Sequence, residues 1–343
     1  MATQTKVKSF ALEYVKTIGI VNNGDNGRGF ANPYDTAIAK DGRIFVLNRC
    51  DPARAAAIRI GICNLDEDYL GEFGYGYGEG DGQLIWPVAM AFDSGERLYV
   101  TDEHTNRITV FGPSGKFLAK WGTPGNAQGE LSGPAGIAID ANDDVYVVDQ
   151  ANNRVQKFTR EGRFLTSFGE PGDGEGQFNL PWGLTLDSHG DIYVADWRND
   201  RVQKFAADGR FLASFGRSGE GDGQLSRPSS VAVDDAGFVY VADWGNERLQ
   251  VLTPEGEFVL KLRGQATLSK WAEDFFASNP DEMRERERSN LVPELPPHLQ
   301  TPQQISAQTE PYFWGLASVK LDREGRLYAT ESNRHRIQIF AKR

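Results

Sequence analysis

The chain has 343 residues, a formal net charge of −11 and a sequence pI of about 5.0. This acidic balance argues against a nucleic-acid ligand, which requires a concentrated basic face. No run of about 18 apolar residues is present for a membrane helix, and the first residues lack the apolar core of a signal peptide. Cys50 and Cys63 do not suggest a disulfide framework and are expected to be free thiols. We therefore expect a soluble, cytoplasmic protein that binds neither nucleic acid nor membrane.

A repeat of 47 residues organises the sequence. Prolines recur at this spacing at Pro87, Pro134, Pro181 and Pro228. An aspartate and an arginine recur with them, at Asp102, Asp149, Asp196 and Asp243 and at Arg107, Arg154, Arg201 and Arg248. A period of this length, built from short strands, is typical of a β-propeller.

The chain begins with two segments that precede the first repeat. Residues 1–9 are expected to form a loose arm. Residues 14–19 match the pattern of residues 164–169, which form the outer strand of a later repeat. We predict that this strand completes the last blade and closes the ring, because closure removes exposed strand edges.

Blade 1 spans residues 33–74, and blades 2 to 5 begin at the four repeat prolines. In blade 4, residues 183–186, 192–195, 201–205 and 210–215 predict four antiparallel strands, A to D, joined by polar turns. In blade 1 the hairpin between strands B and C is six residues longer, and Asn48 replaces the repeat aspartate. The recurring Asp–Arg pair is predicted to be a structural tie within each blade, because a feature present in every repeat does not mark one active site.

Between blade 5 and blade 6, which spans residues 313–340, the sequence carries an insertion of 41 residues. Within residues 264–311, Leu268, Trp271, Phe275 and Phe276 fall on one helical face. Residues 279–282 then predict the start of a short charged helix, and a proline-rich segment predicts an extended return. The insertion is therefore expected to be helical.

The repeat PWGLTLDSHGDIYVADWRNDRVQKF and its copies resemble NHL repeats, whose family fold is a six-bladed β-propeller. The resemblance covers nearly all of the chain outside residues 1–9 and the insertion. We therefore predict one all-β domain over residues 10–343. It is a six-bladed β-propeller of the NHL type, with the first strand closing the last blade and a helical insertion between blades 5 and 6.

Both irregularities of the repeat, the long blade 1 hairpin and the insertion, fall on the face that carries the B–C hairpins. Departures from a repeat on one face often mark the binding face. An amphipathic helix there would lid the central pocket and exclude water, or it would pack on the side of the ring and add only stability. The sequence leaves both alternatives open.

The repeat register places candidate side chains around this pocket. Aromatic walls with a few polar groups are typical of small-molecule sites. The candidate ligand-binding residues are Trp182, Trp197, Trp244, Asp35, Asn106, Asn153 and Trp314. Asp200, Glu247 and His335 occupy equivalent hairpin positions of blades 4 to 6 and are candidates for one divalent metal or for acid–base catalysis. The alternatives are blade-to-blade packing for the tryptophans and solvated hairpin positions for the three titratable residues.

Residues 45–50, FVLNRC, are similar to the Phe-His-Arg-Gly setting of a functional arginine in peptidyl-hydroxyglycine amidating lyases, which are also six-bladed, and Arg49 matches that arginine. The zinc-binding histidine triad of that family is absent, because the corresponding positions carry Asn106, Trp182 and Ala317. The calcium ligands of gluconolactonase-like propellers are absent as well, because Val88, Ala135 and Trp182 stand at the starts of the inner strands.

Two functions remain open from the sequence. The first is a ligand-binding protein or a lyase-like or hydrolase-like enzyme, in which Arg49 clamps or polarises the ligand and Asp200, Glu247 or His335 acts as general base. The second is a protein-interaction module that uses the same face.

Overall fold

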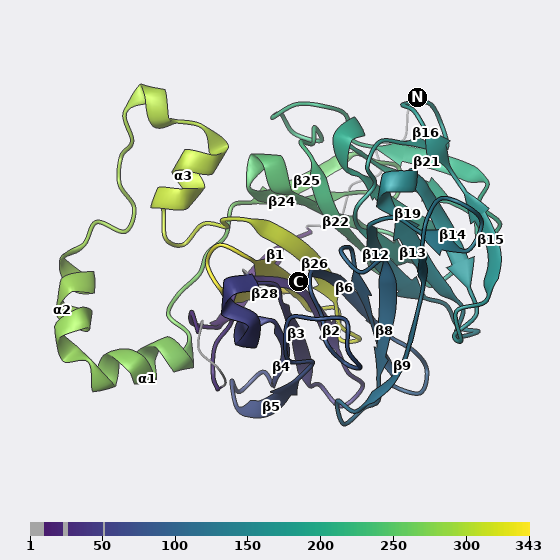
Figure 1. Ribbon diagram of the computed structural model, residues 1–343. Coiled ribbons are helices and arrows are strands. Elements are labelled where there is room, and N and C mark those ends of the chain that lie inside the picture. The colour runs from purple at the N-terminus through teal and green to yellow at the C-terminus, as the bar shows by residue number, and fades with distance from the viewer. Residues whose placement is uncertain (1–9, 23–26, 51) are drawn as a thin grey trace, which may run out of the picture.

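The computed structural model describes residues 10–22, 27–50 and 52–343; the predicted arm of residues 1–9 lies outside this part of the chain. The described residues form six four-stranded antiparallel sheets (Figure 1). Their innermost strands contact one another in a closed cycle, from β2 (Pro33–Ile38) through β6 (Pro87–Phe92), β12 (Pro134–Ile139), β18 (Leu184–Leu186), β22 (Pro228–Val233) and β26 (Leu316–Leu321) back to β2. The fold is therefore a six-bladed β-propeller, as the repeat predicts.

Each blade runs from inner strand A to outer strand D. The remaining strands of blades 1 to 3 are β3 (Ile44–Asn48), β4 (Arg59–Cys63) and β5 (Tyr69–Phe73), then β7 (Leu98–Asp102), β8 (Arg107–Phe111) and β9 (Phe117–Trp121), then β13 (Val145–Asp149), β14 (Arg154–Phe158) and β15 (Phe164–Phe168). Those of blades 4 to 6 are β19 (Ile192–Asp196), β20 (Arg201–Phe205) and β21 (Phe211–Phe215), then β23 (Val239–Asp243), β24 (Arg248–Leu252) and β25 (Phe258–Leu262), then β27 (Leu327–Glu331) and β28 (Arg336–Lys342). Two short parallel pairs brace D-to-A connections: β10 (Thr123–Pro124) with β11 (Glu130–Leu131), and β16 (Glu170–Pro171) with β17 (Gln177–Phe178).

The outer strand of blade 6 comes from the start of the chain. β1 (Leu12–Ile18) pairs antiparallel with β28, in a register that joins Leu12 to Lys342 and Ile18 to Ile337. The strand order of this sheet is β1-β28-β27-β26. The first and last described strands therefore lie side by side.

The inner strands approach one another closely around the axis. The backbone N–H of Gly136 donates a hydrogen bond of 2.8 Å to the carbonyl of Trp182 in the next blade. A β-carbon on Gly136 would lie 2.5 Å from that oxygen, and one on Gly183 would lie 2.6 Å from the carbonyl oxygen of Ser229. Glycine is required at both positions because any side chain would force the blades apart.

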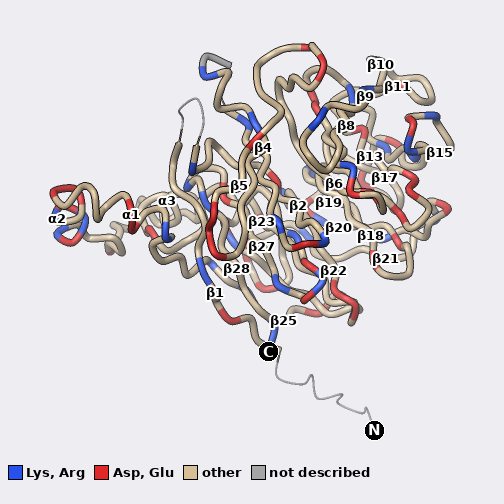
Figure 2. Tube along the Cα trace, turned by 90° about the horizontal axis from the view of Figure 1, so that it is seen from below, with Lys and Arg blue, Asp and Glu red and all other residues tan. Residues whose placement is uncertain are grey.

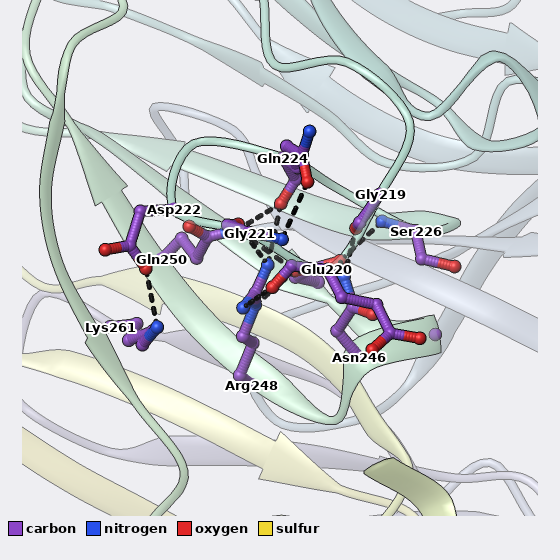
Figure 3. Close-up of polar contacts among 12 residues, drawn as sticks. Gly219, Glu220, Gly221, Asp222, Gln224, Ser226, Asn246, Arg248, Gln250 and Lys261 are labelled. Atoms are coloured by element: carbon purple, nitrogen blue, oxygen red, sulfur yellow. Dashed lines mark hydrogen bonds and ion pairs between the residues drawn. The ribbon is translucent and has the colours of Figure 1, made fainter. Parts of the chain in front are cut away.

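The predicted Asp–Arg tie is present in blade 5, where Arg248 Nε donates to the carboxylate of Asp243 at 2.7 Å. Figure 3 shows the same guanidinium reaching the carbonyls of Glu220 and Gly221 in the loop that leads into the blade. Blades 3, 4 and 6 repeat the tie with the pairs Asp149–Arg154, Asp196–Arg201 and Glu331–Arg336. One buried carboxylate and one arginine thus fix each of these hairpins to the preceding loop.

Short helices occur in the B–C hairpins and in the insertion. The hairpins carry the 3-10 turns η1 (Pro52–Ala57), η2 (Gln150–Asn152), η3 (Trp197–Asn199) and η4 (Trp244–Asn246). The insertion carries α1 (Lys270–Ser278), α2 (Pro280–Arg288), η5 (Pro297–Leu299) and α3 (Pro302–Gln308). The sequence predicts an extended return where α3 forms; Thr301 caps this helix by accepting the N–H of Gln304.

The insertion is fixed to the side of the ring. Trp271 of α1 is buried, its ring centre lies 5.6 Å from that of Phe30, and its indole N–H donates to the carbonyl of Glu67. Figure 1 shows α1 and α2 projecting to one side of the blades, and Figure 2 shows acidic and basic residues together on α2. At the other end, Arg334 of blade 6 donates to two carbonyls of α3. These contacts place the insertion at the rim.

Two further expectations concern the cysteines and the membrane. Cys50 and Cys63 are both free and buried, and burial raises the pKa of Cys63 to about 12. Within the described ranges, none of the helices combines the length and apolar character needed to cross a bilayer.

Candidate functional site

A cavity of about 180 Å³ lies on the axis, at the face that carries the B–C hairpins. Four of its lining residues are aromatic and come from blades 1, 4 and 5. We call this cavity the aromatic cup; its lining consists of Tyr34, Trp182, Trp197, Ser229, Trp244, Ala317, Ser332 and Asn333. The structure therefore brings together three tryptophans that the sequence register selects.

Local backbone structure positions these rings. The N–H of Trp182 donates to the carbonyl of Ala195 at 2.8 Å, which holds Trp182 at the start of the inner strand. Trp197 and Trp244 each begin a 3-10 turn directly after a fully buried B strand. Their ring centres lie 6.5 Å apart, within the range of favourable aromatic pairs. All three side chains are half-buried and keep part of their surface open to a ligand.

Tyr34 is a cup residue that the sequence analysis missed. Pro33 pairs with Asn48 as Pro87 pairs with Asp102, so the equivalent of Val88 and Trp182 in blade 1 is Tyr34. Asp35 therefore lies one residue deeper than the position assigned to it. Counting from Pro33 would have found the correct register. Burial raises the pKa of Tyr34, and the nearby guanidinium of Arg49 opposes that shift.

Arg49 is held between blades 1 and 2. Its Nη2 atom contacts Glu103 Oε1 at 2.5 Å, and its guanidinium carbon lies 4.8 Å from the ring centre of Tyr34 and 5.5 Å from that of Trp86. Arg49 is not part of the cup lining. Its guanidinium packs on the ring of Tyr34, and its ion pair with Glu103 joins the two blades.

Five hairpin residues share one structural role. Each has a positive φ near +50°, and its side chain accepts a backbone N–H from the segment that begins the next blade. These bonds run from Gly133 to Asn106, from Leu180 to Asn153, from Arg227 to Asp200, from Gly315 to Glu247 and from Asn32 to His335, at 2.7 to 2.9 Å. We call them the inter-blade clasps. In blade 1 the equivalent residue is Ile58, and the Arg49–Glu103 pair spans that junction instead.

The clasps explain why Asp200, Glu247 and His335 do not form one centre. Each of them binds the backbone at a different blade junction. Within the described ranges, no group of three or more His, Cys, Asp or Glu side chains is placed to hold a metal ion. Burial raises the pKa of Glu247 to about 7 and lowers the pKa of His335. Trp314 also lies outside the cup lining, with its ring 5.3 Å from the guanidinium carbon of Arg334.

Below the cup the axis narrows to a second cavity of about 20 Å³, which we call the waist. Cup and waist share Tyr34, Trp182, Ser229 and Ala317, so the waist is the floor of the cup. Asp35 is buried here; its Oδ2 atom accepts the N–H of Met90 at 2.8 Å and lies 3.2 Å from Lys320 Nζ.

The axis opens again at the A–B turns, where a third cavity encloses about 510 Å³. Its lining mixes apolar strand residues with both signs of charge, including Lys40, Asp93, Asp140 and Arg323. None of the insertion residues 264–311 lines the cup. Gln303 of α3 donates to the carbonyl of Gly245, in the hairpin that carries Trp244, so α3 lies next to the cup without lining it.

Comparisons with known proteins agree with the fold. Residues 178–205 and 225–252 match the NHL repeat, and residues 87–167 match a family described as a 6-bladed beta-propeller. No curated protein sequence matches the chain. These family matches confirm the predicted NHL-type, six-bladed architecture.

Solved structures with a similar fold include two lyases. A streptogramin B lyase has a TM-score of 0.57 and 14% sequence identity, over 97% of this chain and 98% of the other. Virginiamycin B lyase from Staphylococcus aureus has a TM-score of 0.55 and 15% identity, over 97% and 99%. A protein of unknown function from Bacteroides thetaiotaomicron reaches 0.61 with 16% identity, over 97% and 76%. At this identity the likeness establishes the fold alone.

Proposed function

Because the chain is a six-bladed β-propeller that carries NHL repeats, we propose that it binds a small molecule in the aromatic cup. The observation that carries the proposal is the convergence of Tyr34, Trp182, Trp197 and Trp244 on one axial cavity. Concave, aromatic sites with few polar groups are the usual form of ligand pockets.

The size of the cup limits its ligand. Pockets for drug-sized molecules typically enclose about 300–1,000 Å³, whereas the cup encloses about 180 Å³. An engineered apolar cavity of about 150 Å³ binds benzene. A ligand of one ring, or one ring of a larger molecule, therefore fits.

A binding role is better supported than a lyase or hydrolase reaction. Tyr34 is the one titratable side chain of the cup lining, and its raised pKa keeps the phenol neutral. The candidate bases Asp200, Glu247 and His335 are engaged in the inter-blade clasps. A reaction in the cup would have to recruit the Asp35–Lys320 pair of the waist.

Binding of single-ring probes tests the proposal. Toluene and benzyl alcohol are titrated by saturation-transfer NMR and by tryptophan fluorescence. Trp182→Ala is expected to weaken binding about tenfold or more, because removing a wall ring forfeits about 1.5–3 kcal/mol of apolar burial. Trp86→Phe is the matched control, since Trp86 lies outside the cup lining and is 39% exposed. Equal affinities for wild type and Trp182→Ala would contradict the assignment.

A protein-interaction scaffold is the second candidate, and the exposure of Trp86 and of Phe275, at 39% and 45%, favours it. Exposed aromatic side chains are enriched at protein interfaces. Selection from a peptide display library separates the two functions. Peptides that depend on Trp86 or Phe275 and tolerate Trp182→Ala would support the scaffold.

A further inference from the structure

One layer of six equivalent residues surrounds the waist. In each blade the layer residue lies two positions after the start of the inner-strand repeat, and the six are Asp35, Ala89, Gly136, Gly183, Ser230 and Ser318. The polar members come from blades 5, 6 and 1, which are neighbours in the ring. The opposite half consists of alanine and glycine.

Two polar atoms of this layer have no partner in the protein. Asp35 Oδ1 and Ser318 Oγ form no hydrogen bond with any residue that the structure describes, although Asp35 is only 2% and Ser318 only 4% exposed. The other serine of the layer differs, because Ser230 Oγ bonds to both the N–H and the carbonyl of Val319. Buried polar groups in native proteins almost always have a partner, and both residues line the waist, so a group bound in the waist is expected to supply it.

The charges around the waist select the chemistry of that group. Lys320 Nζ already lies 3.2 Å from Asp35 Oδ2, so a second cation would be repelled by the ammonium. A carboxylate or phosphate would be repelled by Asp35. A neutral hydroxyl satisfies both atoms, because it donates to Asp35 Oδ1 and accepts from Ser318 Oγ.

The size of the waist agrees with a single hydroxyl group at this position. A volume of about 20 Å³ admits one water-sized group, which needs about 10–15 Å³. A ring in the cup above would place a substituent of one or two heavy atoms at this level.

We infer that the cup takes a ligand that has a ring and a hydroxyl group, and that the hydroxyl enters the waist and bonds to Asp35 and Ser318. This inference rests on the proposed function of the cup. In the free protein one water molecule occupies the same position, and the ligand hydroxyl replaces it without leaving either atom unpaired.

The test compares benzyl alcohol with toluene, which has the same ring and no hydroxyl. Wild type is expected to bind benzyl alcohol at least as tightly as toluene, although toluene is the more hydrophobic. Ser318→Ala is expected to weaken benzyl alcohol binding about tenfold and to leave toluene unchanged. This variant removes no protein hydrogen bond, so it should fold normally. Ser230→Ala, in the same layer, is the matched control and should preserve the preference for the alcohol while losing stability.

The outcomes separate the two proposals. If wild type binds both probes and Ser318→Ala changes both affinities equally or neither, the hydroxyl site is refuted and the cup stands. If neither probe binds, the cup and the hydroxyl site fail together. A high-resolution crystal structure of the free protein adds a ligand-independent check. It should show one water within hydrogen-bond distance of Asp35 Oδ1 and Ser318 Oγ, and its absence would overturn the inference.

Discussion

Replacement of Glu247 by glutamine is expected to stabilise the protein above neutral pH. Glu247 is 3% exposed, and its Oε2 atom accepts the N–H of Gly315 at 2.7 Å across the junction of blades 5 and 6. Burial raises the pKa of this carboxyl from 4.5 to about 7; the nearby Glu331 adds to the shift, and the hydrogen bond from Gly315 opposes it. Glutamine keeps a carbonyl acceptor for Gly315 and cannot ionise.

The sign and the size of the expected change in stability follow from proton linkage. Between pH 4.5 and about 7 the folded state retains a proton that the unfolded state has released. The free energy of unfolding therefore falls as pH rises through this window. The difference between the two pKa values corresponds to roughly 3 kcal/mol, at 1.36 kcal/mol per pH unit. The stability of Glu247→Gln relative to wild type should grow by that amount across the window.

Urea unfolding followed by tryptophan fluorescence, at several pH values from about 4.5 to about 8, measures this difference. Asp200→Asn is the matched control, because Asp200 holds the same clasp position in blade 4 and is not fully buried. The stability of Asp200→Asn relative to wild type should vary less with pH over the same window. A constant difference between Glu247→Gln and wild type at all pH values would refute the assignment of a buried carboxyl with a raised pKa.

Two further predictions concern the inter-blade clasp at the junction of blades 6 and 1 and the insertion. Burial lowers the pKa of His335, whose Nδ1 atom accepts the N–H of Asn32, so its contribution to stability is present above pH 6.5 and is lost as pH falls below that value. His335→Asn, which supplies the residue found at this position in blades 2 and 3, should reduce the loss of stability on acidification; an unchanged acid profile in urea unfolding would contradict this. Trp271→Ala should lower the free energy of unfolding by about 3–5 kcal/mol, as for a buried aromatic residue. Phe275→Ala, on the exposed side of the same helix, should lower it by less than about 0.5 kcal/mol. Similar losses in both variants would show that Trp271 is not the anchor of the insertion.

The fold could be predicted because the same strand pattern recurs in successive repeats. The spacing of Pro181, Asp196 and Arg201 recurs in neighbouring blades, and each copy predicts the same four strands. The insertion carries no repeat, so its placement depends on single contacts such as that of Trp271 with Phe30. Sequence periodicity detects the helical face but does not say which surface the face covers.

The site could be predicted only in part, for two physical reasons. Trp182, Trp197 and Trp244 follow from the register, because the two repeat positions that they occupy line the cup in blades 4 to 6. Tyr34 was missed because the blade 1 register was counted one residue too far. The hairpin position of Glu247 suggested convergence on the axis, but its positive φ turns each such side chain toward the next blade. That backbone conformation is not visible in the residue types.

The pairing of β1 with β28 has a consequence for biosynthesis. Tyr14 is synthesised 326 residues before its partner Phe340. At about 5–20 residues per second, translation of these 326 residues takes roughly 15 to 65 s. Throughout that time β1 lacks its partner strand and the nascent blade 6 sheet is incomplete. The ring can therefore close only after β28 has been synthesised, when β1 pairs with it.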